Sequence, residues 1–145
     1  MFDLYALPHD FPGFSEAKNQ NDPYQRVEIL EKAFAQDIAN DRFIPYIQLH
    51  EFETLVFADP QQLDWEYMEH DKSVGRLVKM IGDKNPELIN DGKETAPSKR
   101  IIAEIPEYDK LGGVIVVEKI GLKKLRSRCR HFSEWLNRLE QLANL

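Results

Sequence analysis

The chain has 145 residues, of which 42% are hydrophobic and 30% charged, and a net charge of −6, which suits one globular domain with its own core. No apolar run approaches the ~20 residues that a membrane-spanning helix needs, and no signal-peptide pattern opens the chain. A single cysteine, Cys129, excludes an internal disulfide and a CxxC zinc site, so the composition favours the reducing cytoplasm.

Two apolar segments with a strong helix signal between them open the chain. Residues 2–7 and 43–49 are predicted as strands, and Asp22-Pro23 is typical of a helix start, with apolar residues at helical spacing after it. A strand, helix and strand in this order indicate a parallel pair with a right-handed crossover. The sequence therefore predicts an α/β fold in which helices flank a small parallel sheet, as in Rossmann-like proteins.

The rest of the chain is predicted to be rich in helix. The expected elements are a short helix or turn at 50–57, a helix in the second part of 63–81, a polar loop at 83–96, a short helix at 97–105 capped by Thr95, and helices at 122–130 and 131–142. Residues 110–121 are ambiguous, because Val114–Val117 favour a strand but no turn separates them from Gly112-Gly113. Residues 1–145 are expected to form a single domain.

Acidic side chains follow or interrupt the two predicted strands. Asp3 lies within the first strand, and His50, Glu51 and Glu53 come directly after the second. Ligands of α/β sheets bind beyond the carboxyl ends of the strands, so these groups are expected at one rim. Carboxylates that lie close together repel unless a cation joins them, which favours Mg²⁺. The alternative is that the acids only complement the dipole of a helix N-terminus.

Basic side chains are concentrated in the second half of the chain. Residues 1–70 carry 14 acidic and 4 basic side chains, whereas residues 71–145 carry 11 and 15. Lys99 and Arg100 fall in the first turn of the predicted helix at 97–105, where an anion can bind. Arg126 and Arg128 belong to the densest basic run, which suits a nucleic acid. The alternative for both groups is a solvated helix surface.

Long blocks of the sequence resemble a bacterial family, domain of unknown function 4276. They are FDLYALPHDFPGF, DPYQRVEILEKAFAQDI, RFIPYIQLHEFETLVFADP, ELINDGKETAPSKRIIAEIPEYDK and IGLKKLRSRCRHFSEWLNRLE. The resemblance implies a Toprim-like domain whose acids hold Mg²⁺, and a nuclease-like component that acts on nucleic acid. It also implies an ATPase partner protein in a phage-defence system. The rival hypothesis is a non-catalytic protein-interaction module.

The resemblance carries over to particular residues. Asp3 matches an acid of the family, although Tyr5 stands where Toprim proteins have a second Asp. Glu51 and Glu53 match a His-Glu-x-Glu segment. The basic matches are Lys99, Arg100, Arg126 and Arg128. The family's opening block, similar to Val-Glu-Gly-x-Thr-Glu, does not precede Phe2. The chain is therefore expected to be a truncated, inactive Toprim-like domain whose exposed sheet edge favours a homodimer.

Overall fold

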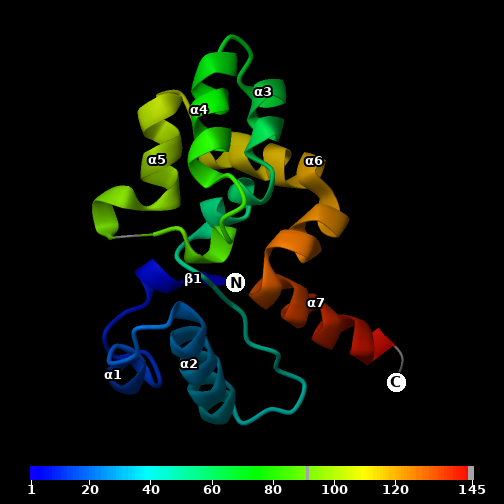
Figure 1. Ribbon diagram of the computed structural model, residues 1–145. Coiled ribbons are helices and arrows are strands. Elements are labelled where there is room, and N and C mark those ends of the chain that lie inside the picture. The colour runs from blue at the N-terminus through cyan, green and yellow to red at the C-terminus, as the bar shows by residue number, and fades with distance from the viewer. Residues whose placement is uncertain (91, 144–145) are drawn as a thin grey trace. The chain divides into compact units, whose positions relative to one another are not determined.

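The computed structural model describes residues 1–90 and 92–143 of the chain. The chain divides into two compact units: residues 1–49 with 131–145 form the first, and residues 50–130 form the second. Figure 1 shows α1 beside α2 in the first unit, and α4 beside α5 in the second. The prediction that residues 1–145 are a single domain stays a prediction.

The first unit contains a two-stranded parallel sheet. β1 (Phe2–Asp3) pairs with β2 (Ile47–Gln48), so that Phe2 lies opposite Ile47 and Asp3 opposite Gln48. The crossover between the strands contains α1 (Phe14–Ala17) and α2 (Pro23–Ile38), and α2 packs against β2. The predicted α/β fold with a small parallel sheet and flanking helices is confirmed.

Both strands are shorter than predicted. A 3₁₀ helix, η1 (Leu4–Ala6), follows β1 directly, and the strand conformation of the second segment is confined to Ile47–Gln48. Pro45, which has no backbone N–H to donate, lies in the segment that was expected to continue β2. Apolar composition therefore located the strands but overestimated their length.

α2 forms where the sequence predicted a helix. Asp22 Oδ1 accepts the Tyr24 N–H at 3.0 Å, and Pro23 occupies the first turn. The helix ends after Ile38, with Ala39 in the left-handed region at φ 50°. Its buried face and the residues around it form the core of the first unit, which comprises Leu7, Ala17, Val27, Leu30, Ile47 and Leu49.

Loss of the Asp22 cap is expected to destabilise the chain. In Asp22→Ala the Tyr24 N–H loses its acceptor, and we expect the free energy of unfolding to fall by about 1 kcal/mol. Asp37→Ala on the same helix is the matched control: this exposed acid near the C-terminus opposes the dipole, so its removal should not destabilise. Urea unfolding of both variants checks the difference, and equal losses would contradict the cap.

A buried hydrogen-bonded cluster holds α7 (Arg130–Ala143) in the first unit. Glu31 Oε1 accepts the Ile47 N–H at 2.8 Å and contacts His131 Nε2 at 2.9 Å. The His131 ring stacks on Tyr46, with centroids 5.2 Å apart and planes 17° apart. One carboxylate on α2 thus binds both β2 and α7.

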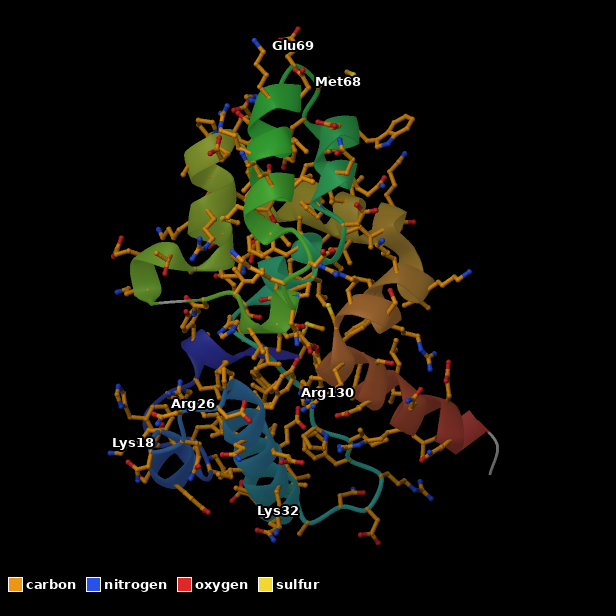
Figure 2. All side chains as sticks on the ribbon, viewed as in Figure 1. Lys18, Arg26, Lys32, Met68, Glu69 and Arg130 are labelled. Atoms are coloured by element: carbon orange, nitrogen blue, oxygen red, sulfur yellow. The ribbon has the colours of Figure 1, made fainter. Side chains whose placement is uncertain are left out.

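The second unit consists of helices, several of them short 3₁₀ turns. Its elements are η2 (Phe52–Thr54), η3 (Val56–Ala58), η4 (Pro60–Gln62), α3 (Leu63–Glu66), α4 (Asp71–Ile81), η5 (Pro86–Leu88), η6 (Lys93–Thr95), α5 (Pro97–Glu104) and α6 (Lys110–Arg128). Met68 and Glu69 mark the turn from α3 to α4, and both side chains point away from it (Figure 2). Asp91, in the predicted polar loop, lies outside the described residues. The helix-rich C-terminal half is confirmed.

The ambiguous segment at 110–121 is helical. α6 begins after Asp109, whose carboxylate accepts the Gly112 N–H at 2.7 Å, and it buries Val116 and Ile120 one turn apart. Burial of this face outweighs the strand propensity of the β-branched residues. The helix bends at Gly121, where φ is 75° and ψ is 157°.

Among the described residues, no helix is both long enough and apolar enough to cross a membrane.

Candidate functional site

The acids that the sequence groups together fall in different units. Asp3 lies in β1 of the first unit, whereas His50, Glu51 and Glu53 lie at the start of the second. In neither unit do the described residues bring together three His, Cys, Asp or Glu side chains able to hold a metal ion. A metal site formed by Asp3, His50, Glu51 and Glu53 stays a prediction. The last three of these residues lie in the second unit.

Glu53 combines deep burial with a carboxylate oxygen that has no hydrogen-bond partner. It lies in η2 and only 1% of its surface is exposed. Oε1 accepts the Tyr108 hydroxyl at 3.3 Å, but Oε2 is buried and has no hydrogen-bond partner. Burial raises the pKa of the Glu53 carboxyl above its ordinary value, and the negative charge of Glu51 adds to the rise. A hydrogen bond from the Glu53 backbone, the charge of Lys110 and the Tyr108 hydroxyl oppose it.

Glu51 caps a helix that lies far from it in the sequence. Its Oε1 accepts the Ser98 N–H in the first turn of α5 at 2.5 Å. The prediction that Thr95 caps this helix is wrong, because the N-cap residue is Ala96, which has no side-chain acceptor. A carboxylate from residue 51 replaces it and complements the helix dipole. Glu51 thus interacts with the first turn of α5, which also holds Lys99 and Arg100, and its role as a metal ligand stays a prediction.

His50 is hydrogen-bonded to η5 and to the loop that follows it. Its ring is buried, its Nε2 lies 2.9 Å from the Glu87 carbonyl oxygen, and its Nδ1 lies 3.3 Å from Asn90 Nδ2. Because the carbonyl can only accept, Nε2 donates to it and Nδ1 accepts from the amide. The backbone at His50 adopts φ 60°, a conformation that costs energy and is enriched at functional sites. To bind a metal, His50 must give up one of these contacts.

Sequence reasoning missed Tyr108 and the glycine pair beside it. Tyr108 is buried, and its ring lies 5.8 Å from that of Tyr67, centroid to centroid. A Cβ at Gly113 would overlap the Tyr108 hydroxyl, and one at Gly112 would overlap the hydroxyl of Tyr67. A glycine in a helix costs about 1 kcal/mol relative to alanine. Two adjacent glycines in the first turn of a helix could have indicated that other side chains occupy the space beside them.

The two basic residues of α5 have different surroundings. Lys99 is exposed, whereas Arg100 Nε donates to the Thr95 carbonyl at 2.6 Å and Nη1 lies 3.2 Å from Met80 Sδ. Arg100 also lines an open pocket of about 210 Å³ together with Arg76, Leu77, Met80, Ala103 and Glu104. The prediction that Lys99 and Arg100 hold phosphate together stays a prediction.

The basic run on α6 includes a residue with a structural role. Arg128 Nη2 donates to the carbonyl oxygens of Gly82 and Lys84, at 3.1 and 2.9 Å, and so ties the end of α6 to the loop after α4. Arg126 is half-buried on the same helix. The neighbouring Cys129 is buried, and burial raises the pKa of its thiol, which disfavours the reactive thiolate.

Ionisation of Glu53 is expected to make stability depend on pH. Its folded pKa lies above the ordinary 4.5, so the folded chain keeps the proton longer than the unfolded chain. The resulting stabilisation is complete below pH 4.5 and is lost as pH rises through the folded value. Glu53→Gln has no titrating group at position 53. As pH rises above 4.5, the wild-type chain should therefore lose stability relative to this variant.

Thermal unfolding of both proteins between pH 4 and 9 checks this prediction. Glu118→Gln, at an exposed position on α6, controls for the change in net charge. A stability difference between wild type and Glu53→Gln that does not vary with pH would contradict the raised pKa.

The chain was compared with curated proteins, solved structures and protein families. No curated protein and no solved structure matches it. One family matches residues 1–140, which include every candidate site residue above, and its description is "Domain of unknown function (DUF4276)". The resemblance noted in the sequence is confirmed, and the chain belongs to the DUF4276 family.

Proposed function

We propose that this chain is a Mg²⁺-dependent, Toprim-like and nuclease-like component that acts on nucleic acid. The observation that carries the proposal is Glu53 Oε2, a buried carboxylate oxygen without a partner, next to the charge of Glu51. A buried carboxylate oxygen without a hydrogen bond is costly, and a fold that keeps one is a candidate for function. A cation that binds this oxygen would remove the cost.

The donor atoms suit Mg²⁺. Magnesium is typically held by one or two carboxylates together with water and substrate phosphate, so Glu51 and Glu53 are a sufficient protein contribution. Each has a carboxylate oxygen besides the one that accepts a hydrogen bond. A bound Mg²⁺ would supply positive charge to a phosphate group. His50, which belongs to the same unit, is the further ligand that its place after the second strand suggests, and Asp3, in the other unit, stays a prediction.

The basic residues would meet the phosphates. Lys99 is exposed next to Ser98, whose N–H binds Glu51, so a phosphate near the carboxylates would be within the neighbourhood of Lys99. Arg100, Arg126 and Arg128 are the other proposed contacts. The resemblance adds an ATPase partner protein and a role in phage defence to the proposal, and the single cysteine adds a place in the cytoplasm.

Binding of a fluorescent oligonucleotide tests the proposed function. At low salt, where phosphate contacts are strongest, we expect binding in Mg²⁺ or Mn²⁺ and much weaker binding in EDTA. Lys99→Ala should weaken it, whereas Lys72→Ala, at an exposed position on α4, should do so less. Metal-dependent cleavage of the oligonucleotide would add support. Neither metal-dependent binding nor cleavage, with DNA or RNA, would overturn the proposal.

A non-catalytic interaction module is the second candidate, and exposed apolar residues on α6 favour it. Leu111 is 71% and Leu122 59% exposed, and Val114 and Ile115 are exposed between them. Exposed apolar groups of this kind are common at protein interfaces. Sedimentation of the wild-type chain and of Leu111→Ser tests whether this surface joins two copies: a dimer that the substitution dissociates would favour the module, and a monomer in both would not.

A further inference from the structure

The first turn of α6 is built around two phenol hydroxyls. A Cβ at Gly113 would overlap the hydroxyl of Tyr108 and lie 3.1 Å from its Cζ. A Cβ at Gly112 would overlap the hydroxyl of Tyr67 and lie 2.8 Å from its Cζ. The glycines are thus the positions at which both hydroxyls reach the helix backbone, and we call Gly112 and Gly113 the glycine seat.

Space, and not backbone conformation, requires glycine at these positions. Neither residue has a positive φ, in contrast to Gly82 and Gly121. Glycine disfavours a helix, so alanine would be the better residue at both sites if nothing occupied the space. Gly75 on α4 is a helical glycine beside which the space is empty, since a Cβ there would have no neighbour within 4 Å.

The hydroxyl is the group that a Cβ at Gly113 would meet most severely, since its oxygen would lie closer to that Cβ than the ring carbon Cζ, which would lie at 3.1 Å. A phenylalanine at position 108 would fill the same buried volume and would not bring an oxygen into the place of the Gly113 Cβ. That oxygen lies 3.3 Å from Glu53 Oε1. Packing alone therefore does not account for the combination of Tyr108 and Gly113, whereas the hydrogen bond to Glu53 does.

Tyr67 acts on the same end of α6. Its hydroxyl accepts the Asp109 N–H at 3.2 Å, and Asp109 is the residue that caps the helix. Lys110, the next residue, is the cation whose charge acts on Glu53. Both tyrosines thus fix parts of the structure that contact Glu53 or act on its charge.

We propose that the glycine seat places the Tyr108 hydroxyl on Oε1 of Glu53, so that Tyr108 is a positioning residue that leaves Oε2 as the oxygen available to a cation. The identity of the ligand rests on the proposed function above. The orientation of the carboxyl by Tyr108 does not, because it is a property of the chain without any ligand.

The test combines Tyr108→Phe, Gly113→Ala, the double variant and Gly75→Ala. The first readout is the ¹³C carboxyl resonance of Glu53, identified by its absence in Glu53→Gln. We expect it to move in Tyr108→Phe and in Gly113→Ala, and to stay in place in Gly75→Ala. A resonance that is unchanged in Tyr108→Phe would overturn the proposal.

The second readout is the melting temperature. Gly113→Ala should lower it in the wild-type background and lower it less, or raise it, in the Tyr108→Phe background, because the overlapping oxygen is gone. If Gly113→Ala fails to fold while the double variant folds, the seat is supported. If the effects of the two changes simply add, or if neither protein folds, the seat does not serve the hydroxyl and the proposal is wrong.

Titration with Mn²⁺ separates the two proposals. Tyr108→Phe should bind Mn²⁺ more weakly than wild type by about tenfold, the lower range for loss of a group that orients a metal ligand. If the wild-type chain binds no Mn²⁺, the proposed function fails, while the carboxyl resonance and the coupling of Tyr108 to Gly113 still decide the positioning role.

Discussion

Glu53→Gln is expected to weaken Mg²⁺ and Mn²⁺ binding by at least about a hundredfold, the upper range for loss of a supporting group at a metal site. The substitution keeps the size of the side chain and the acceptor for Tyr108, but it replaces the carboxyl oxygen that has no partner in the folded chain. The same change should raise the melting temperature at neutral pH, because it removes the cost of a buried charge. Isothermal titration calorimetry with both metals measures the affinity.

Glu118→Gln makes the same change in net charge at an exposed position of α6 and should leave metal affinity unchanged. If Glu53→Gln gains stability and loses metal binding, Glu53 is a residue that costs stability but is needed for function. If Glu53→Gln binds both metals as the wild-type chain does, Glu53 is not a ligand.

Glu31→Ala should destabilise the first unit by about 3–5 kcal/mol, the range for removal of one partner of a buried pair. The substitution leaves the Ile47 N–H and the His131 ring without their acceptor, and both are buried. β2 and the start of α7 should loosen together, because one carboxylate binds both. Urea unfolding gives the loss of stability, and amide exchange at Ile47 reports the broken hydrogen bond.

Two variants of α2 control this result. Glu31→Gln keeps an acceptor oxygen and should lose less stability than Glu31→Ala. Glu28→Ala, at an exposed position three residues earlier, should change the free energy of unfolding by less than about 0.5 kcal/mol. Equal effects of Glu28→Ala and Glu31→Ala would mean that the buried cluster does not hold the unit together.

Local signals predicted the elements of the first unit well. Asp22, Pro23 and the apolar spacing from Val27 determine where α2 begins and which face it buries, and all of these are neighbours in the sequence. The extent of β1 and β2 depends on which backbone groups find a partner, and a parallel pair of two residues per strand leaves no local trace. The same applies to α6, whose β-branched residues are helical because the helix buries Val116 and Ile120.

The sequence indicated which residues belong to the candidate site, but not which residues they contact. The segment from His50 to Glu53 was recognisable as polar groups directly after a strand. The partner of Glu51 is Ser98, 47 positions away, and the partner of Glu53 is Tyr108, 55 positions away. Contacts at such separations arise from packing, so a single sequence does not show them. Thr95 was predicted to cap α5 because it lies just before the helix in the sequence. In the structure the capping carboxylate is that of Glu51, which is distant in the sequence.

Broadening of NMR signals by Mn²⁺ tests the central claim most directly, because it locates a bound cation without a variant. Substoichiometric Mn²⁺ added to the labelled wild-type chain should broaden the resonances of Glu51, Glu53 and Tyr108 before all others of the second unit. Excess Mg²⁺ should restore them. Broadening that spares these residues and instead affects exposed acidic residues such as Glu69 and Asp71, or no broadening at all, would contradict the claim that Glu53 binds a cation.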